Sequence, residues 1–576
     1  MSLRIKSFQD YEKAYKKSIE DPKQFWDEIA KSFHWKEDYQ KVLEWDFKKP
    51  DVKWFLGGKL NITENALDRH LEERGNKVAL IWEPNDPKES SVRYTYKELH
   101  KQVCIFANAL KEKGIRKGDR VCLYMPMVPE LTIAALACAR IGAVHSVVFA
   151  GFSAKALSDR IEDAQAKMVI TADGLNRGEK QVQLKTVVDE AIESSASVES
   201  VIVYNCLGWN PNMKTGRDFW WHDVIQEQKT NCPAEKMDSE DMLFILYTSG
   251  STGKPKGVVH TCAGYMVYAA YSFQNVFQYK ESDIYWCTAD VGWITGHSYI
   301  IYGPLLSGAT TMMFEGVPTW PNPGRFWEVC EKHKVNQFYT APTAIRALMG
   351  QGNEWVEKHD LNDLKILGTV GEPINEEAWE WYHSKVGKGR CAVVDTWWQT
   401  ETGGIMISGL GDLSPQKPTY AGYPLPGVQP VLLNQEGKEI KEPNTEGYLA
   451  IKFPWPSMIR TTYGDHERCR KVYFSAYPDH YFTGDGAKRD ENGMYRIIGR
   501  VDDVINVSGH RFGTAEIEDA IDSHENVIEC AVVGYPHDLK GQGIYCYVVC
   551  AKPFENQENG REQITNAVVK EIGKIA

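Results

Sequence analysis

Hydrophobic residues follow two different periods along the middle of the chain. Between about residues 118 and 172, short apolar runs alternate with stretches in which apolar residues recur every three or four positions. In 153–165, for example, Leu157, Ile161 and Ala164 form one apolar stripe behind a capping Ser153. This alternation predicts a parallel sheet with right-handed crossovers. The expected strands are 121–125, 143–150 and 167–172, and the expected helices are 129–141 and 153–165.

The same alternation returns after Gly324 and predicts a second doubly wound layer. Strands are expected at 335–340, 364–370 and 391–395, with helices ending at 334 and spanning 343–349 and 375–384.

Other parts of the chain have different patterns. Residues 1–60 are rich in tryptophan, and Phe25, Trp26 and Ile29 stand near helical spacing, which predicts a helical extension packed on the main domain. Short alternating strands and turns from about 419 to 500 predict a small β-barrel or sandwich. The expected fold is therefore α/β, with a large domain 61–501 of two doubly wound subdomains plus this β-rich part. A small α/β domain, 502–576, follows it.

Composition limits the classes of partner. The 576 residues are 43% hydrophobic and 25% charged, and their net charge of −12 argues against nucleic acid or an anionic membrane as the main partner. The most apolar window, 131–152, is interrupted by Arg140, Gly142 and His145, so it predicts a buried helix and strand instead of a membrane span. Thirteen cysteines without a Cys-x-x-Cys pair favour a reducing cytoplasm.

The segment 247–257, Tyr-Thr-Ser-Gly-Ser-Thr-Gly-Lys-Pro-Lys-Gly, follows an apolar strand and is typical of a loop that holds phosphate groups. Glycines let backbone amides approach phosphate oxygens, while hydroxyls and lysines add donors and positive charge. The loop is not a P-loop, because Thr248 stands where that motif requires glycine and Pro255 follows Lys254. A solvated glycine-serine loop is the alternative.

Three expected strands end in polar loops, at 248–250, 371–373 and 395–403. Ligands of open α/β sheets bind beyond the carboxyl ends of the strands, so these loops are candidates for one shared site. Taken singly, Asp395 could cap a turn, and Trp397 and Trp398 could belong to the core.

Two further elements lie nearer the C-terminus. Asp485 stands between two glycines, where its carboxylate could accept hydrogen bonds from both hydroxyls of a ribose. The segment 499–511 carries Arg500 and Arg511, whose guanidinium groups suit phosphate or sugar oxygens. A turn aspartate and solvated surface arginines are the alternatives.

Together, these five elements resemble the motif series of the adenylate-forming superfamily, which contains acyl-CoA synthetases, luciferases and the adenylation domains of peptide synthetases. The resemblance covers nearly the whole chain, and segments 290–297, 395–404 and 504–517 are most similar to AMP-forming acetyl-CoA synthetases. It implies that a carboxylate attacks the α-phosphate of ATP, and that the thiol of coenzyme A then displaces AMP. Propionate or another short acid is the alternative substrate.

The resemblance assigns an ATP site. Thr248 to Lys254 would wrap the β- and γ-phosphates, Glu401 would hold Mg²⁺, and Arg511 would contact the phosphates. Asp485 and Arg500 would bind the ribose. The residues expected to flank or line the nucleotide are Gly371, Glu372, Pro373, Asp395, Thr396, Trp397, Trp398, Gln399 and Thr400. A second magnesium site would use groups near Asp522, His524 and Val527.

The resemblance also assigns an acyl pocket and a coenzyme A site. The indole of Trp398 would close the acyl pocket, leaving room for little more than a methyl group, with Ile294, Thr295 and Val370 as the other walls. The residues expected to bind coenzyme A are Arg177, Gly178, Glu179, Lys180, Thr295, Thr319 and Ser508. Lys180 and Thr319 replace an arginine and an asparagine of the family pattern.

In this family a lysine near the end of the small domain contacts the reacting groups during adenylation, and Asp502 resembles the hinge of that domain. The expected position of the lysine lies beyond Ala576. A C-terminally truncated chain is therefore expected to make acetyl-AMP poorly while still converting it to acetyl-CoA. A catalytically impaired nucleotide- or CoA-binding protein is the alternative from another functional class.

Overall fold

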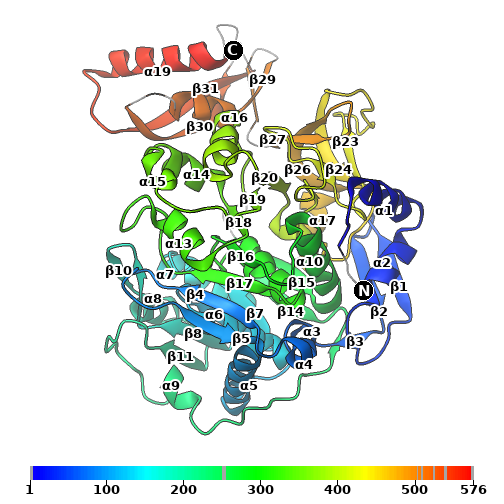
Figure 1. The fold of residues 1–576 in the computed structure, drawn as a ribbon, viewed down its shortest axis with the longest axis vertical. Helices are drawn as coiled ribbons and strands as arrows, with labels where there is room; N and C mark the ends of the chain where they lie inside the picture. The colour runs from blue at the N-terminus through cyan, green and yellow to red at the C-terminus, as the bar shows by residue number, and fades with distance from the viewer. Residues whose placement is uncertain are drawn as a thin grey trace. The chain divides into compact units, whose positions relative to one another are not determined.

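The computed structural model describes residues 4–248, 255–501, 504–507, 510–522, 524, 526–537 and 541–572. The chain forms two compact units (Figure 1). The first unit contains Met1–Gln429 and Ile451–Tyr481, and the second contains Pro430–Ala450 and Phe482–Ala576. The β-rich segment expected at 419–500 is thus divided between them.

An eight-stranded sheet of the first unit contains the first predicted alternation. Its order is β12-β11-β8-β6-β7-β14-β15-β25, and β6 pairs in parallel with both β7 and β8. The predicted β-α-β-α-β series is confirmed. The strands are β6 (Arg120–Tyr124), β7 (Val144–Val147), β8 (Met168–Ala172), β11 (Ser200–Tyr204), β12 (Asp218–Trp220), β14 (Met242–Thr248), β15 (Lys256–Thr261) and β25 (Thr461–Thr462), and the neighbouring helices are α5 (Tyr96–Glu112), α6 (Pro129–Arg140), α7 (Ala154–Ala164) and α8 (Leu184–Ala191).

A nine-stranded sheet contains the second alternation, in the order β22-β21-β20-β19-β18-β16-β17-β4-β5. Its central strands are parallel. The strands are β4 (Val78–Glu83), β5 (Val92–Thr95), β16 (Ile284–Cys287), β17 (Thr310–Phe314), β18 (Gln337–Thr340), β19 (Ile366–Thr369), β20 (Ala392–Trp397), β21 (Ile407–Ser408) and β22 (Tyr423–Pro424). The helices after Gly324 are α13 (Arg325–His333), α14 (Pro342–Met349), α15 (Glu354–Glu357), α16 (Glu376–Trp381) and the π-helix η3 (Tyr382–Val386).

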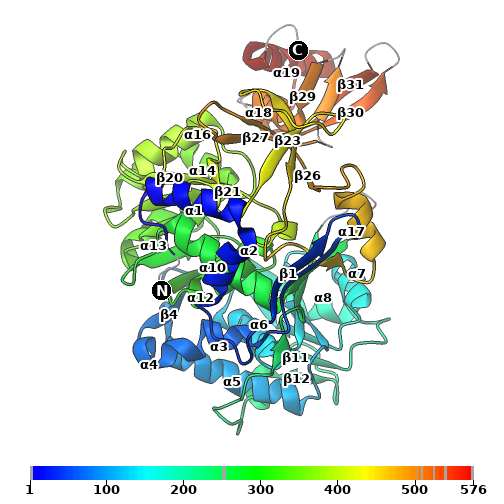
Figure 2. The same cartoon turned by 90° about the vertical axis from the view of Figure 1, so that its right-hand side faces the viewer.

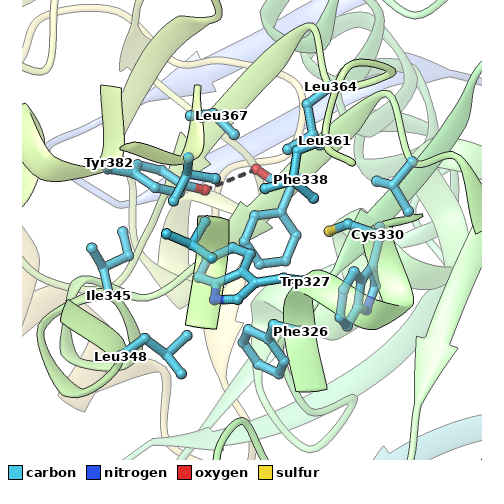
Figure 3. Close-up of a cluster of buried hydrophobic side chains, with 14 of the residues drawn as sticks. Phe326, Trp327, Cys330, Phe338, Ile345, Leu348, Leu361, Leu364, Leu367 and Tyr382 are labelled. Atoms are coloured by element: carbon cyan, nitrogen blue, oxygen red, sulfur yellow. Dashed lines mark hydrogen bonds between the residues drawn. The ribbon is translucent and has the colours of Figure 1, made fainter. Parts of the chain in front are cut away.

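An aromatic cluster fills one face of this second sheet (Figure 3). Phe326 and Trp327 of α13 pack against Phe338 of β18, with ring centroids 5.7 and 5.9 Å apart. The hydroxyl of Tyr382 donates a hydrogen bond to the carbonyl of Phe338 at 3.3 Å. The buried phenol thereby keeps a partner while its ring adds to the core.

Helix α10 (Cys262–Phe277) lies in the interior of the first unit, and almost all of its residues are buried. A helix that is apolar on every side must be covered on every side. Part of that cover comes from α2 (Pro22–Ala30), whose Phe25 and Trp26 contact Tyr271 of α10, as Figure 2 shows for the two helices.

The N-terminal segment is only partly helical. Helices α1 (Phe8–Glu20) and α2 are followed by an antiparallel hairpin of β1 (Lys41–Asp46) and β2 (Asp51–Leu56), which differs from the all-helical expectation. Leu43 pairs with Trp54, and both are buried while the flanking Lys53 and Glu44 are less so. Alternation of buried and more exposed residues is the two-residue period of a strand. The spacing of the tryptophans alone did not distinguish such a strand from a helix.

The remaining short elements of the first unit are β3 (Lys59–Leu60), α3 (Ile62–Ala66), η1 (Asp68–His70), α4 (Leu71–Arg74), β9 (Gly174–Arg177), β10 (Lys180–Gln183), α9 (Trp221–Val224), β13 (Met237–Asp238), α11 (Ile294–Gly296), the π-helix η2 (His297–Tyr302), α12 (Gly303–Leu306), η4 (Thr400–Thr402) and α17 (His466–Tyr473).

The second unit contains two four-stranded sheets, in the orders β23-β24-β26-β27 and β29-β28-β31-β30. The barrel or sandwich expected for 419–500 is instead one open sheet, because β22 and β25 pair with the two large sheets of the first unit. The elements are β23 (Pro430–Leu433), β24 (Glu446–Ile451), β26 (Tyr481–Arg489), β27 (Tyr495–Arg500), β28 (Val504–Val507), β29 (His510–Gly513), α18 (Thr514–Asp522), β30 (Val527–His537), β31 (Gly541–Cys550) and α19 (Gln557–Ile572).

Across the described ranges, no helix combines the length and the apolar character that crossing a bilayer requires.

An ion cluster built around two fully buried side chains connects β4 to α13. Glu83 bonds Arg325 at 2.7 Å and His333 at 2.7 Å, and the side chains of Glu83 and Arg325 have no exposed surface. Burial alone would raise the pKa of Glu83, but hydrogen bonds from His333, Lys332 and Arg325 outweigh it and hold this pKa at about 2. The carboxylate therefore stays ionised inside the core.

Replacing Glu83 by alanine is expected to destabilise the protein strongly, because it leaves the Arg325 guanidinium buried without its main counter-charge. The free energy of unfolding should fall by about 3–5 kcal/mol. Glu328→Ala is the matched control, since Glu328 pairs with the same arginine but its side chain is 41% exposed. Thermal unfolding by circular dichroism would measure both, and equal shifts for the two variants would contradict the assigned role of burial.

Candidate active site

The carboxyl ends of β19 and β20 lie side by side, as the sequence predicted for two of the polar loops. The strands pair in parallel, with Thr369 opposite Asp395. Gly371 follows β19 with φ of +103°, a conformation that favours glycine. The loop Gly371-Glu372-Pro373 and the loop after Trp397 therefore leave the same edge of the sheet.

Glu372 is held at this edge by the start of α14. Its carboxylate accepts a hydrogen bond from the backbone amide of Thr343 at 2.7 Å and pairs with Arg346 at 2.9 Å. The carboxylate is thereby directed toward α14, while Gly371 and Pro373 are exposed at the edge of the sheet.

Strands β14 and β15 form the hairpin that contains the glycine-rich loop. Thr248 ends β14 and lies opposite Lys256, the start of β15. Lys254 and the rest of 249–254 lie outside the described residues. The antiparallel pairing brings Lys256 back to the end of β14. Lys256 belongs to the glycine-rich segment 247–257, but the sequence had given it no role.

Glu401, the expected magnesium ligand, is in contact with a lysine and a tyrosine. Lys256 lies 3.3 Å from its Oε1, the hydroxyl of Tyr473 donates to the same oxygen, and Lys256 also donates to Tyr473 at 2.6 Å. Burial, followed by the charge of Glu401, raises the pKa of Tyr473 well above its usual value, so the phenol remains a donor. Tyr473 comes from α17, 72 residues along the chain, and no local sequence signal identified it.

His260 of β15 fixes the backbone beside Glu401. Its Nε2 lies 2.7 Å from the carbonyl of Thr400. Burial lowers the pKa of His260 to about 4, against the hydrogen bond to Thr400, so the ring is neutral and donates through Nε2. His260 is a second site residue that the sequence analysis missed.

The indole of Trp398 is oriented by a chain of hydrogen bonds. Its Nε1 donates to the hydroxyl of Tyr339 at 3.2 Å, which lies 2.7 Å from Oγ1 of Thr396. The Trp398 ring stands nearly perpendicular to that of Tyr299, with centroids 5.0 Å apart. Tyr299 belongs to η2, which directly follows α11, so the structure brings Trp398 to the segment that contains Ile294 and Thr295.

The other expected wall residue, Val370, follows β19 and donates its amide to the carbonyl of Thr340 at the end of β18. It is 8% exposed, and Ile294 is 7% exposed. Val370 and Ile294 are thus almost completely buried, whereas Trp398 is only partly buried.

The expected coenzyme A loop is a tight hairpin. Arg177 ends β9 opposite Lys180 of β10, and Gly178 between them has φ of +62°. The Arg177 guanidinium lies 5.7 Å from the ring centroid of Phe149, which lies 5.8 Å from that of the exposed Trp293. Phe149 was not among the predicted residues, although aromatic faces near cations are a common recognition element.

The segment that contains Thr319 lies against this hairpin. A Cβ built on Gly178 would be 3.4 Å from the side chains of Trp320 and Val317. Thr319, between these two residues, is exposed. The structure therefore brings Arg177, Gly178 and Thr319 to one part of the first unit, while Ser508 lies outside the described residues.

The ribose candidates face each other within the second unit. Asp485 of β26 is paired with Arg500 of β27, and Nη1 of Arg500 lies 3.7 Å from Oδ1 of Asp485. Gly484 has φ of +74°, and a Cβ there would come within 2.6 Å of the guanidinium. Glycine at 484 thus allows the arginine to lie across the strand.

The other candidates of the second unit are less completely described. Arg511 lies on β29 opposite Asn506, and Asp502 lies outside the described residues. For the second magnesium site, α18 ends at Asp522, and the amide of Val527 donates to the carbonyl of His524 at 2.9 Å. Both ring nitrogens of His524 also have partners, Asn526 and Gln563.

Within the described ranges, no group of three or more His, Cys, Asp or Glu residues could hold a metal ion. Glu401 is a single buried carboxylate. One carboxylate is sufficient for Mg²⁺ in a nucleotide site, because the ion is usually held there by one or two carboxylates together with phosphates and water.

The chain matches three family models in succession. The model described as AMP-binding enzyme matches residues 67–460, the acetyl-coenzyme A synthetase N-terminus matches 11–66, and the AMP-binding enzyme C-terminal domain matches 516–576. The chain therefore belongs to the AMP-binding enzyme family, and the resemblance to adenylate-forming enzymes is confirmed.

Its relatives include named acetyl-coenzyme A synthetases. The protein of Alkalilimnicola ehrlichii is 57% identical over 98% of this chain and 88% of its own length. That of Bdellovibrio bacteriovorus is 56% identical with the same coverage. Among solved structures, the acetoacetyl-CoA synthetase of Streptomyces lividans shares the fold, with a TM-score of 0.87 and 23% identity over 96% of this chain and 84% of that one.

Asp395 provides a test of the electrostatics at the strand ends. Burial raises its pKa to about 6, against a 2.6 Å hydrogen bond from Thr369. Because this folded-state pKa exceeds the usual value of about 3.9, the protein loses stability as pH rises from about 4 to about 6, the range in which Asp395 is protonated when folded but ionised when unfolded.

We expect Asp395→Asn to stabilise the fold by roughly 1–3 kcal/mol near pH 8, with the gain vanishing toward about pH 4. The asparagine keeps an acceptor for Thr369, so the neutral contact survives. Urea unfolding across this pH range would measure the difference. A gain that is the same at both ends of the range would show that the carboxylate of Asp395 is not strained by burial.

Proposed function

We propose that this protein is an acetate–CoA ligase. A carboxylate oxygen of acetate attacks the α-phosphorus of ATP, and the bond to pyrophosphate breaks to give acetyl-AMP. The thiol sulfur of coenzyme A then attacks the acetyl carbonyl carbon, AMP leaves with its phosphate oxygen, and the thiol loses its proton. The observation that supports acetate most directly is the oriented indole of Trp398 at the end of β20, in a chain whose relatives are named acetyl-coenzyme A synthetases.

The first step is an electrostatic problem, because a carboxylate must approach a polyanion. The β14–β15 hairpin supplies Thr248 and Lys256 beside the buried Glu401, and we assign the phosphates to this region. Lys254, from the same loop, completes the proposed set of phosphate contacts. Such preformed charges lower the activation barrier of acetyl-AMP formation because they position the reactants, and no covalent bond to the protein is needed.

Glu401 is the proposed magnesium ligand, and bound Mg²⁺ would offset the charge of the phosphates. The contacts of Lys256 and Tyr473 hold this carboxylate in place, and Lys256 partly neutralises it. His260 fixes the adjoining carbonyl of Thr400, so Thr400 can present its side chain to a phosphate. Asp522, His524 and Val527 remain a proposed second magnesium site.

The remaining nucleotide contacts are proposed residue by residue. Gly371, Glu372 and Pro373 would flank adenine, Asp395 to Thr400 would line the nucleotide, and Arg511 would reach the phosphates. Asp485 would accept hydrogen bonds from the ribose hydroxyls, in the position where Arg500 already faces it. Asp502 would be the hinge between half-reactions.

Coenzyme A is proposed to bind beside the β9–β10 hairpin. Arg177 and Lys180 are placed on opposite strands of the turn, where two cations can face a diphosphate. Trp293 and Phe149 offer aromatic surface along the approach to Thr295. Gly178, Glu179, Thr319 and Ser508 complete the proposed set.

A cytoplasmic location is also proposed. All thirteen cysteines are unpaired, and most are buried. Reduced thiols of this kind are typical of proteins kept in a reducing compartment.

The proposed activity is tested by AMP formation that requires acetate, ATP and coenzyme A together. Glu401→Gln should lower kcat/KM by about 10²- to 10³-fold, the scale for losing one preorganised electrostatic contact. Glu467→Gln, an exposed acid of α17, is the control and should leave the rate unchanged. AMP formation that does not depend on acetate would contradict the proposal.

Trp398→Gly should shift the preference from acetate toward medium-chain acids, because removing the indole lengthens the acyl pocket. In the unaltered protein, propionate should be a weaker but usable substrate, since one methylene changes discrimination by only about 1–3 kcal/mol. The kcat/KM values for acetate, propionate and hexanoate would measure the shift. Unchanged ratios in the variant would remove Trp398 from the acyl pocket.

A further inference from the structure

A second site candidate is a cavity of the first unit that opens to solvent, with a volume of about 550 Å³. It lies where the ends of both large sheets meet. Asn85 and Asp86 follow β4, Glu315 directly follows β17, and Tyr204 ends β11. The carboxyl ends of parallel strands are where α/β folds bind ligands. Of the lining residues, Gly178 and Glu179 belong to the proposed coenzyme A set, and the others have no role assigned above.

The charged side chains that line the cavity are all acidic: Asp86, Glu89, Glu130, Glu179 and Glu315. Among the described residues in its wall there is no lysine, arginine or histidine. Five carboxyl groups without a counter-charge in the same wall produce a negative potential that a cation would relieve.

Two of these carboxyl groups have an oxygen that is buried and accepts no hydrogen bond in the described structure, namely Oε1 of Glu315 and Oε2 of Glu130. Buried polar atoms normally have partners, so each of these oxygens points to a donor that the protein itself does not supply. The other oxygen of Glu315 accepts only a long, 3.4 Å hydrogen bond from the amide of Asn85.

Burial raises the pKa of both groups. For Glu315 the pKa rises to about 7, with Glu89 adding to the rise and the Asn85 amide opposing it. For Glu130 burial is opposed by hydrogen bonds from its own backbone and from Tyr204. The other titratable groups that face them are Asp86, Tyr94, Glu179 and Cys206.

The remaining wall includes four aromatic residues, Trp82, Tyr94, Tyr204 and Trp320. Aromatic faces attract cations, and they also cover the methylene groups between two ammonium groups. A cavity with carboxylates in several places and apolar surface between them suits a flexible organic cation better than a compact metal ion, which would need several oxygens converging on one point.

We propose that this cavity binds an organic polyammonium ion, a linear diamine or polyamine, with its ammonium groups on Glu130 and Glu315. The ligand supplies a hydrogen-bond donor to the one oxygen of each carboxyl group that accepts none, and its alkyl chain lies along the aromatic residues.

Isothermal titration calorimetry of the full chain with spermidine, near pH 8 and without nucleotide or coenzyme A, tests this directly. Glu315→Gln should raise the Kd about tenfold, the scale for losing one charged hydrogen bond. Glu130→Gln should act in the same direction. Glu436→Gln, an exposed acid of the second unit, is the matched control and should bind like the unaltered protein.

The pH dependence is a second readout that a merely structural role of Glu315 would not produce. Binding should weaken as pH falls through about 7, because protonated Glu315 no longer attracts a cation, and this dependence should disappear in Glu315→Gln. Folding of each variant is checked by its melting temperature, which should not fall, since the substitution removes a buried charge. Absence of spermidine binding to the unaltered protein would overturn the proposal. Equal binding by all variants, or binding of Mg²⁺ alone, would do the same.

The cavity shares a wall with the proposed coenzyme A hairpin. Asn85 donates to the carbonyl of Gly178 at 2.9 Å and accepts from its amide at 3.0 Å, so the cavity wall fixes the turn between Arg177 and Lys180. If the proposed function holds, saturating spermidine should change the KM for coenzyme A more than that for acetate. The calorimetric test needs neither substrate, so its outcome is independent of the ligase assignment.

Discussion

The parallel pairing of β18, β19 and β20 is the constraint on which the proposed active site depends. Because Thr369 lies opposite Asp395, the loops that follow the two strands must leave the sheet at the same edge. The network from Trp398 through Tyr339 and Thr396 to the carbonyl of Thr369 then connects all three strands. A shift of one residue in this register would turn each of these side chains to the other face of the sheet.

Charge is distributed unevenly in the first unit, although the whole chain is acidic. Lys256 stands beside Glu401, and Arg177 and Lys180 occupy one hairpin, so positive groups gather where phosphates are proposed to bind. In the wall of the cavity described above, which includes Gly178 and Glu179 of the same hairpin, the charged side chains are all acidic. Asn85 of the cavity wall makes two hydrogen bonds to Gly178 in the hairpin turn. The positive side chains of the hairpin and the acidic side chains of the cavity therefore lie close to the same turn.

Buried polar groups do much of the positioning. Glu83, His260 and Asp395 are all buried, yet they differ in protonation because their partners differ. Glu83 is ionised among cations, and His260 is neutral beside a carbonyl. For Asp395, burial raises the pKa against hydrogen bonds from the Thr369 hydroxyl and the Thr396 backbone. Such groups tolerate little displacement, which keeps the strand ends rigid around the proposed substrates.

The sequence by itself determined the α/β class, the two alternating series of strands and helices, and most of the motif residues, because apolar period and glycine placement are local properties. The loops at 371–373 and 395–403 could be assigned to one edge since parallel strands end together. The sequence did not distinguish the β1–β2 hairpin from a helix, nor a barrel from the open sheet of the second unit, because strand pairing depends on distant partners. Only the tertiary structure brought Tyr473 and His260 to the Glu401 loop, from 72 and 140 residues away. Burial, and with it the pKa of Asp395 and Glu315, was likewise decided by packing, since no local pattern fixes how much water a carboxylate retains.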